Sequence, residues 1–243
     1  MLYLIGIGLN DEKDISVKGL YLVKESDFIY LEYYTSRLQC SIEKLEKFYG
    51  KKIIIADRSF VENSNEILDK SKNKKVAFLV MGDVFSATTH IDLFLRAKKR
   101  GIKIEVVNNA SIINAIGITG LEVYKFGKIT SIPFDNKNIR TPIEVYKMNK
   151  KNNLHTLFLL DLDPKKENYM EIKYAIDYLI KNGVDKDTFA VGCARIGSKN
   201  QIIKYKTLRE LKKTNFGKPP YCLIIPGKLH FIEEEALELW KKD

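Results

Sequence analysis

Two glycine-containing segments lie at the ends of predicted strands and could bind a ligand through the main chain. Residues 5–10 read Ile-Gly-Ile-Gly-Leu-Asn, and residues 81–83 read Met-Gly-Asp. Glycine lets the backbone approach a ligand where a side chain would block it. Because ligands of open α/β sheets bind beyond the carboxyl ends of the strands, both segments should face one crevice.

A dinucleotide-binding fingerprint is incomplete in the first segment. The GxGxxG pattern needs a third glycine where this chain has Asp11. Glu32 occupies the place of a ribose-binding acid in such folds, although an ordinary strand-end carboxylate explains it equally well. Asp83 also has two interpretations, because an Asx turn or a helix entry favours aspartate without any ligand. A nucleotide-dependent oxidoreductase is therefore a weak alternative.

The cysteines and histidines form no pattern that would hold a metal ion. The chain has no CxxC pair and no HExxH motif, and an odd number of distant cysteines forms no disulfide framework. We therefore predict no metal site and interpret the cysteines as small buried hydrophobic residues. The residues concerned are Cys40, Cys193, Cys222, His90, His155 and His230.

The first half of the chain alternates short apolar runs with helical patterns. This alternation predicts an α/β domain with a doubly wound parallel sheet. Ser41 can cap a helix that Gly50 ends, and a second helix, through Ile91, Leu95 and Lys99, ends at Gly101. The predicted strands are 2–7, 28–33, 53–56, 76–81 and 103–107.

The pattern changes near the small-residue stretch 110–120, where we place a domain boundary. The second half is also α/β, and its closely spaced strands predict a mixed sheet. We expect domains at 1–112 and 113–243, with a ligand-binding cleft between them. In the second half, the predicted strands are 129–133, 154–161, 188–194, 202–206 and 222–226, and the predicted helices are 142–150, 168–182 and 231–242.

The composition predicts a soluble cytoplasmic protein. The 243 residues are 45% hydrophobic, but no apolar run reaches the about 20 residues that cross a bilayer. Residues 1–6 have no basic n-region, so we expect neither a secretory signal nor a transit peptide. The net charge of +10 comes mostly from dispersed lysines, which favours solvated helix faces over a nucleic-acid-binding stripe. A mildly acidic protein partner and a non-enzymatic nucleic-acid adaptor remain open.

A set of short segments, in this order along the chain, resembles the diphthine synthases, which have the tetrapyrrole methylase fold. The resemblance runs from Leu2 to Glu235 without a large gap. The Gly-Asp pair at 82–83 is shared across the wider fold, whereas YTS, ATTH, GITGL and PGKLH are closer to the diphthine synthases. The segments are LIGIGL at 4–9, DISVKGL at 14–20, YTS at 34–36, ATTH at 87–90, GITGL at 117–121, YKFG at 124–127 and PGKLH at 226–230.

The resemblance implies an S-adenosylmethionine-dependent methyltransferase that N-methylates the aminocarboxypropyl-histidine intermediate on elongation factor 2, in diphthamide biosynthesis. Archaeal-type members are expected to trimethylate the amine, whereas eukaryotic ones add a fourth methyl group on the carboxylate. The compact length favours the archaeal type. The resemblance further implies a homodimer that binds the cofactor between its two domains, largely through main-chain groups. The implied cofactor contacts are Leu9, Asp83, Ser86, Ser111, Ile112, Leu160, Ile196 and Tyr221.

Three positions depart from the family pattern. Val84 stands where proline is usual, Tyr221 where many members have histidine, and Ser86 where an aliphatic residue is common. Methyl transfer from a sulfonium chiefly needs alignment and exclusion of water, so no conspicuous catalytic motif is required. The sequence identifies no general base, and 34–36 and Arg195 are only acceptor-side candidates. A tetrapyrrole or ribosomal RNA methyltransferase of the same fold is the nearest alternative.

Overall fold

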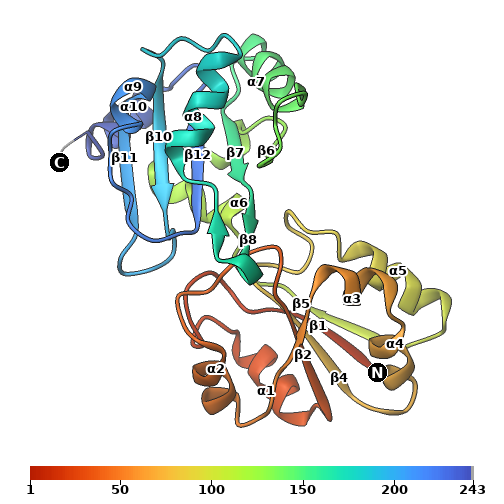
Figure 1. Ribbon diagram of the computed structural model, residues 1–243. Helices are drawn as coiled ribbons and strands as arrows, with labels where there is room; N and C mark the ends of the chain where they lie inside the picture. Colours follow the sequence, from red (N-terminus) through yellow and green to blue (C-terminus); the bar gives the residue numbers. More distant parts are fainter. Residues whose placement is uncertain (242–243) are drawn as a thin grey trace. The chain divides into compact units, whose positions relative to one another are not determined.

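The computed structural model describes residues 1–241 of the chain, which divides into two compact units (Figure 1). We call Met1–Ile113 unit 1 and Asn114–Asp243 unit 2. The division falls one residue beyond the boundary expected from the sequence. None of the helices among the described residues is long and apolar enough to cross a membrane.

Unit 1 contains five strands: β1 (Leu2–Gly6), β2 (Phe28–Glu32), β3 (Ile54–Ala56), β4 (Val76–Val80) and β5 (Ile104–Val107). They form one parallel sheet in the order β3-β2-β4-β1-β5. Every residue of β1 and β4 is buried, which explains their continuous apolar sequences. The parallel sheet predicted for the first half is thus confirmed.

The helices of this part of the chain are α1 (Val17–Glu25), α2 (Ile42–Tyr49), α3 (Arg58–Asn63), α4 (Glu66–Asn73), α5 (Ile91–Lys99) and α6 (Ile112–Ala115). One hydrophobic cluster joins Ile5 and Leu79 to residues of α1 and α2. A second joins Leu4 and Phe78 to residues of α3, α4 and α5. Because successive strand residues point to opposite faces, helices cover both sides of the sheet, as a doubly wound fold requires.

The predicted boundaries of two helices in unit 1 are confirmed. Ser41 caps α2, accepting a hydrogen bond of 3.3 Å from the backbone N–H of Lys44. Gly50 follows the last turn of α2 with a φ of 69°, and Gly101 follows α5 with a φ of 68°. The helices therefore end where the sequence placed their capping residues.

Unit 2 contains a second five-stranded sheet and a short hairpin. The sheet has the order β11-β10-β12-β7-β6, and its strands are β6 (Thr130–Ile132), β7 (Thr156–Leu160), β10 (Phe189–Ala194), β11 (Ile202–Thr207) and β12 (Tyr221–Ile225). β6 and β7 are parallel, whereas the other neighbours are antiparallel, so the predicted mixed sheet is confirmed. The hairpin pairs β8 (Leu162–Asp163) with β9 (Asn168–Tyr169).

The helical elements of unit 2 are η1 (Ile116–Thr119), η2 (Val123–Lys125), α7 (Thr141–Lys151), η3 (Pro164–Lys166), α8 (Ile172–Lys181), α9 (Leu208–Leu211) and α10 (Phe231–Glu238). The helix predicted at 168–182 is wrong at its start, because Asn168 and Tyr169 pair with β8. The backbone N–H of Met170 then donates to Asp161 O at 2.9 Å, before α8 begins. The helix predicted at 231–242 ends at Glu238, and residue 242 lies outside the described residues.

Candidate functional site

The carboxyl ends of β1 and β4 bring together the two glycine segments predicted from the sequence. The N–H of Gly8 donates to Gly82 O at 3.2 Å, and the N–H of Gly82 donates to Gly8 O at 2.7 Å. Both glycines have a positive φ, of 80° and 82°. A Cβ atom on Gly8 would lie 2.4 Å from the Cβ of Asp14, so a larger residue does not fit. The two segments therefore meet at the carboxyl ends of their strands, as the sequence predicted.

The first turn is already occupied by a carboxylate of the chain. Asp14 accepts hydrogen bonds from the backbone N–H groups of Leu9, at 3.1 Å, and Asn10, at 2.7 Å. In dinucleotide-binding folds the N–H groups of this turn and of the following helix bind the pyrophosphate. Here a phosphate would meet a carboxylate instead, so the turn suits a ligand without phosphate groups.

Glu32 is also unavailable to a dinucleotide. Its side chain is fully buried, and it accepts hydrogen bonds from the backbone N–H groups of Tyr34, at 3.3 Å, and Thr35, at 3.1 Å. Burial raises the pKa of Glu32, although these hydrogen bonds act in the opposite direction. The interpretation of Glu32 as a ribose-binding acid is therefore replaced by a structural role, in which it fixes the turn after β2.

Asp83 joins two loops at the carboxyl edge of unit 1. Its buried carboxylate accepts hydrogen bonds from Phe85 N (3.1 Å), Ser86 Oγ (2.9 Å), Asn108 Nδ2 (3.0 Å) and Asn109 N (3.1 Å). Burial alone would raise its pKa, but the four donors prevail and lower it. The carboxylate is therefore ionised at neutral pH and a poor proton acceptor. The bond from Phe85 N is the predicted Asx turn, and the same carboxylate also binds the two asparagines that follow β5.

Asn109 belongs to this site, although the sequence reasoning missed it. Its Nδ2 donates to Gly6 O and Asp14 O, each at 3.0 Å. Asn109 thus connects the segments after β1 and β5, while its backbone binds Asp83. Just beyond it, the hydroxyl of Ser111 accepts from Ile113 N at 3.2 Å. The sequence signal for it was a pair of asparagines, Asn108 and Asn109, after a predicted strand.

The three implied cofactor contacts of unit 2 lie at the same end of three neighbouring strands of its sheet. Leu160 ends β7, Tyr221 begins β12, and Ile196 follows the end of β10 by two residues. The strand order places β12 between β10 and β7, and both of these run antiparallel to it. The sequence-predicted residues of each unit are therefore gathered at a single sheet edge.

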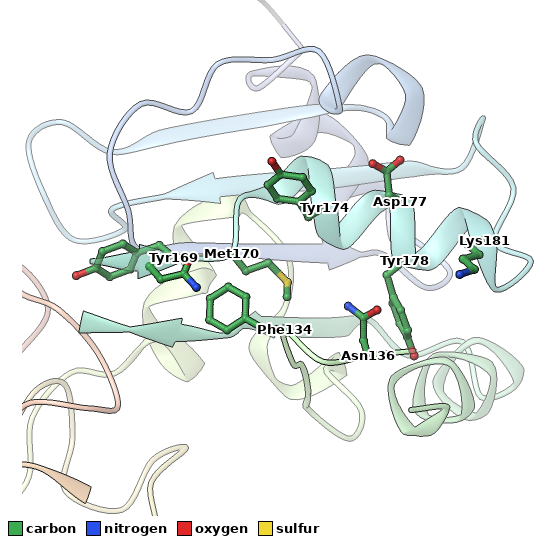
Figure 2. A pocket seen from close by; sticks show the side chains of 9 residues that line it. Phe134, Asn136, Tyr169, Met170, Tyr174, Asp177, Tyr178 and Lys181 are labelled. Atoms are coloured by element: carbon green, nitrogen blue, oxygen red, sulfur yellow. The ribbon is translucent and has the colours of Figure 1, made fainter. Parts of the chain in front are cut away.

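A separate groove of unit 2 contains none of the implied cofactor contacts. It has a volume of about 410 Å³ and runs beside α8, as Figure 2 shows. Tyr174, Asp177, Tyr178 and Lys181 come from α8 itself. The remaining lining residues are Phe134, Asn136, Asn168, Tyr169 and Met170.

Comparisons with known proteins decide the family. The family described as Tetrapyrrole (Corrin/Porphyrin) Methylases matches residues 1–212. A diphthine synthase of Methanosarcina barkeri is 44% identical over 98% of this chain and 94% of its own length. A diphthine methyl ester synthase of Dictyostelium discoideum is 42% identical over 99% of this chain and 98% of its own. The chain belongs to the diphthine synthases of the tetrapyrrole methylase family.

A solved crystal structure of a diphthine synthase has the same fold as this chain. The crystal structure is 43% identical, covers 99% of this chain and 95% of its own, and superposes with a TM-score of 0.93. The two-unit architecture and both sheets are therefore features of the family, and the resemblance noted in the sequence is confirmed.

Two of the segments that carry the resemblance to diphthine synthases, YKFG and PGKLH, meet around one buried glutamate of unit 2. Glu233, on α10, accepts hydrogen bonds from the backbone N–H groups of Glu122, at 2.9 Å, and His230, at 2.8 Å. It also forms an ion pair with Lys125. Burial would raise the pKa of Glu233, but these partners outweigh it and lower the pKa to about 2. The carboxylate is thus charged although fully buried.

His155 completes this network in a defined protonation state. Its Nδ1 accepts a hydrogen bond of 2.9 Å from Gly227 N, so Nε2 carries the proton and donates to Glu233 Oε1 at 2.8 Å. Burial lowers the pKa of His155 despite the neighbouring carboxylate, and the ring is neutral. The YKFG and PGKLH segments therefore support the fold of unit 2. Both segments are recognisable in the sequence, whereas no motif marks Glu233 as their shared partner.

Proposed function

We propose that this diphthine synthase transfers methyl groups from S-adenosylmethionine to the amine of aminocarboxypropyl-histidine on elongation factor 2. The observation that carries the proposal is the 44% identity to a diphthine synthase across nearly the whole chain. Diphthine synthases are S-adenosylmethionine-dependent methyltransferases, and this chain is one of them. Matching relatives named as diphthine synthases favour this acceptor over a tetrapyrrole or a ribosomal RNA.

The carboxyl edge of unit 1 suits this cofactor better than a dinucleotide. S-adenosylmethionine has a sulfonium cation and no phosphate group, whereas the first turn is occupied by the Asp14 carboxylate. The ionised Asp83 lies beside the Gly8–Gly82 pair and adds negative potential there. Charge at this edge therefore favours a cationic ligand over a polyanionic one.

We assign cofactor contacts to the sheet edges of both units. Unit 1 contributes Leu9, Asp83, Ser86, Ser111 and Ile112, and unit 2 contributes Leu160, Ile196 and Tyr221. The resemblance to the family gives these residues position by position. Each set clusters at one end of the strands of its sheet, which supports the assignment. Asp83 and Ser86 are bonded to each other, so their part is to shape the loop that offers main-chain groups.

The chemistry of the acceptor sets what the protein must do. Methyl transfer from a sulfonium is an in-line displacement, so the chain must align the amine with the methyl group and exclude water. The amine must lose a proton before each attack, and transfer to a dry site lowers its pKa. We assign no residue as the general base, and the donors around Asp83 argue against it in that role.

We propose that the product is the trimethylated amine of the archaeal type. The alignment with the archaeal relative spans 252 residues, whereas that with the methyl ester synthase of Dictyostelium spans 269. This chain has only 243 residues, so it lacks segments that the methyl ester synthase contains. The shorter chain favours the enzyme that stops before methylating the carboxylate.

We also propose a cytoplasmic homodimer. Phe231, Ile232 and Leu239, at α10 and its end, are 66%, 50% and 69% exposed, and Tyr124 in η2 is 80% exposed. Exposed apolar side chains concentrated on two contacting segments favour burial against another protein surface. Sedimentation of the wild type and of Phe231→Glu tests this, since the variant should be monomeric. A monomeric wild type would contradict it.

The cofactor is tested by thermal unfolding with added ligands. A ligand that binds only the native state should stabilise the protein by about 2.7 kcal/mol at 100 times its dissociation constant. We expect S-adenosylmethionine and its demethylated product to raise the melting temperature, and NAD to leave it unchanged. A shift with NAD alone would overturn the methyltransferase assignment.

A further inference from the structure

Arg195 is a buried cation whose hydrogen bonds all go to main-chain carbonyl oxygens. The residue is 8% exposed, and none of the carboxylates among residues 1–241 forms an ion pair with it. Its Nε and Nη2 donate to Asn200 O at 3.0 and 2.8 Å, and its Nη1 donates to Phe216 O at 2.8 Å and to Lys218 O. A guanidinium is costly to bury unless its donors are satisfied, and these carbonyl oxygens satisfy them.

These bonds join two loops that flank neighbouring strands. Asn200 belongs to the loop after β10, whereas Phe216 and Lys218 belong to the loop before β12. The backbone N–H of Arg195 also donates to Pro220 O at 2.9 Å. Its φ of 51° is one that non-glycine residues rarely adopt, so the surrounding contacts must hold it there.

Tyr221 adds a second side chain to the same loop. Its hydroxyl donates to Gly217 O, so Arg195 and Tyr221 together bind the carbonyl oxygens of three successive residues, 216 to 218. Burial raises the pKa of Tyr221, which keeps the phenol protonated and able to donate. We call these two side chains and the loops 195–201 and 212–220 the Arg195 clamp.

We propose that Arg195 is a positioning residue for the cofactor, which it serves by holding both loops so that the main-chain groups of Ile196 and Tyr221 are already in place. The inference rests on the proposed function, because that function assigns the two residues to S-adenosylmethionine. Ile196 is the next residue after Arg195, and Tyr221 follows Pro220, so neither can move without disturbing the clamp. Preformed contacts avoid the entropy cost of ordering loops when the ligand binds.

The test compares Arg195→Met and Arg195→Lys with the wild-type full chain. Isothermal titration gives the dissociation constant of S-adenosylmethionine, and steady-state kinetics gives kcat and separate KM values for cofactor and elongation factor. We expect Arg195→Met to raise the cofactor dissociation constant about tenfold or more, and Arg195→Lys to give a smaller rise because an ammonium reaches fewer carbonyls. The KM for elongation factor, and kcat at saturating cofactor, should change by less than about twofold.

Two further variants keep the test decisive. Arg209→Met removes an exposed guanidinium of unit 2 that pairs with Asp187 at 2.7 Å, and it should leave the cofactor dissociation constant unchanged. Tyr221→Phe removes only the bond to Gly217 O, and it should raise the dissociation constant even if Arg195→Met does not fold. Hydrogen exchange in 196–201 and 216–220 should increase in each clamp variant.

The outcomes separate this inference from the proposed function. A wild type that does not bind S-adenosylmethionine would overturn the proposed function. If the wild type binds it, and the folded variants Arg195→Lys and Tyr221→Phe bind it with unchanged affinity, only the proposed positioning role of Arg195 would be overturned. An equal loss of affinity for cofactor and elongation factor would also overturn it, because that result indicates general destabilisation.

Discussion

Asp83 accepts hydrogen bonds from four donors that belong to the loops after β4 and β5. Asp14 and Glu32 are similarly engaged, each by backbone N–H groups of its own loop. At the scale of single residues, these three carboxylates therefore hold loops in place through hydrogen bonds. The role of a carboxylate depends on its hydrogen-bond partners, and these cannot be read from the sequence.

Asp83→Ala should weaken cofactor binding while the fold persists. The substitution leaves four donors without their acceptor, which loosens the loops that offer main-chain groups to S-adenosylmethionine, so we expect an affinity loss of about tenfold. Titration calorimetry measures it, with Asp69→Ala as the control because Asp69 lies on exposed ion pairs of α4. Unchanged affinity with a slower chemical step would instead identify Asp83 as the general base.

At the scale of elements, Glu233 ties α10 to the segments around η2 and β7. Its carboxylate receives backbone donors from Glu122 and His230 and contacts Lys125 and His155. A buried charge of this kind is stabilising only while all its partners remain, and removing one leaves the others unpaired. The segments typical of diphthine synthases are thus linked to the folding of unit 2.

Glu233→Gln should destabilise the protein at neutral pH by about 3 kcal/mol, because the lowered pKa of the carboxylate reflects stabilisation of its charged form. The pKa falls from an ordinary 4.5 to about 2 in the folded chain. The stabilisation is therefore complete above about pH 5 and is lost as the pH falls toward 2.

Urea unfolding of the wild type and Glu233→Gln at pH 7 and pH 3 checks this expectation. The stability difference should be large at pH 7 and smaller at pH 3. Glu234→Gln is the matched control. Glu234 is the next residue on the same helix and is exposed, so this substitution should change the free energy of unfolding little. A difference that does not depend on pH would show that the ionised carboxylate is not the source.

The elements show which parts of the structure the sequence determines locally. Ser41 and Gly50 bound α2 because caps act within one helical turn, and the meeting of Gly8 with Gly82 follows from parallel strands. The start of α8 was mispredicted because Asn168 pairs with Asp163, a tertiary contact that overrides helical patterning. Glu233 was missed because Glu122, one of its donors, lies 111 residues away.

At the scale of the whole molecule, the charge of +10 bears on how a large acceptor is recruited. Many lysines pair with nearby acids at the surface, as Lys72 does with Asp69 on α4 and Lys241 with Glu238 just after α10. The basic side chains nevertheless outnumber the acidic ones by ten over the whole chain. We expect part of this surplus to attract elongation factor 2, because complementary charge raises the rate of encounter.

Methylation at limiting elongation factor should therefore slow as salt rises from low to physiological concentration. Screening shortens the Debye length to about 10 Å at 0.1 M salt, which removes long-range attraction. Cofactor affinity, measured in the same buffers, should change little, because main-chain contacts and the buried Asp83 carboxylate are screened much less by salt than surface charges are. A rate independent of salt would assign the lysines to solubility, and an equal effect on cofactor affinity would place the charge at the cofactor site.

A mass measurement on the acceptor tests directly whether this protein methylates elongation factor 2. The protein is incubated with S-adenosylmethionine and elongation factor 2 carrying aminocarboxypropyl-histidine, and the modified peptide is analysed by mass spectrometry. We expect a final gain of three methyl groups, all on the amine. No gain on this acceptor, under conditions where the protein methylates a tetrapyrrole or ribosomal RNA, would contradict it.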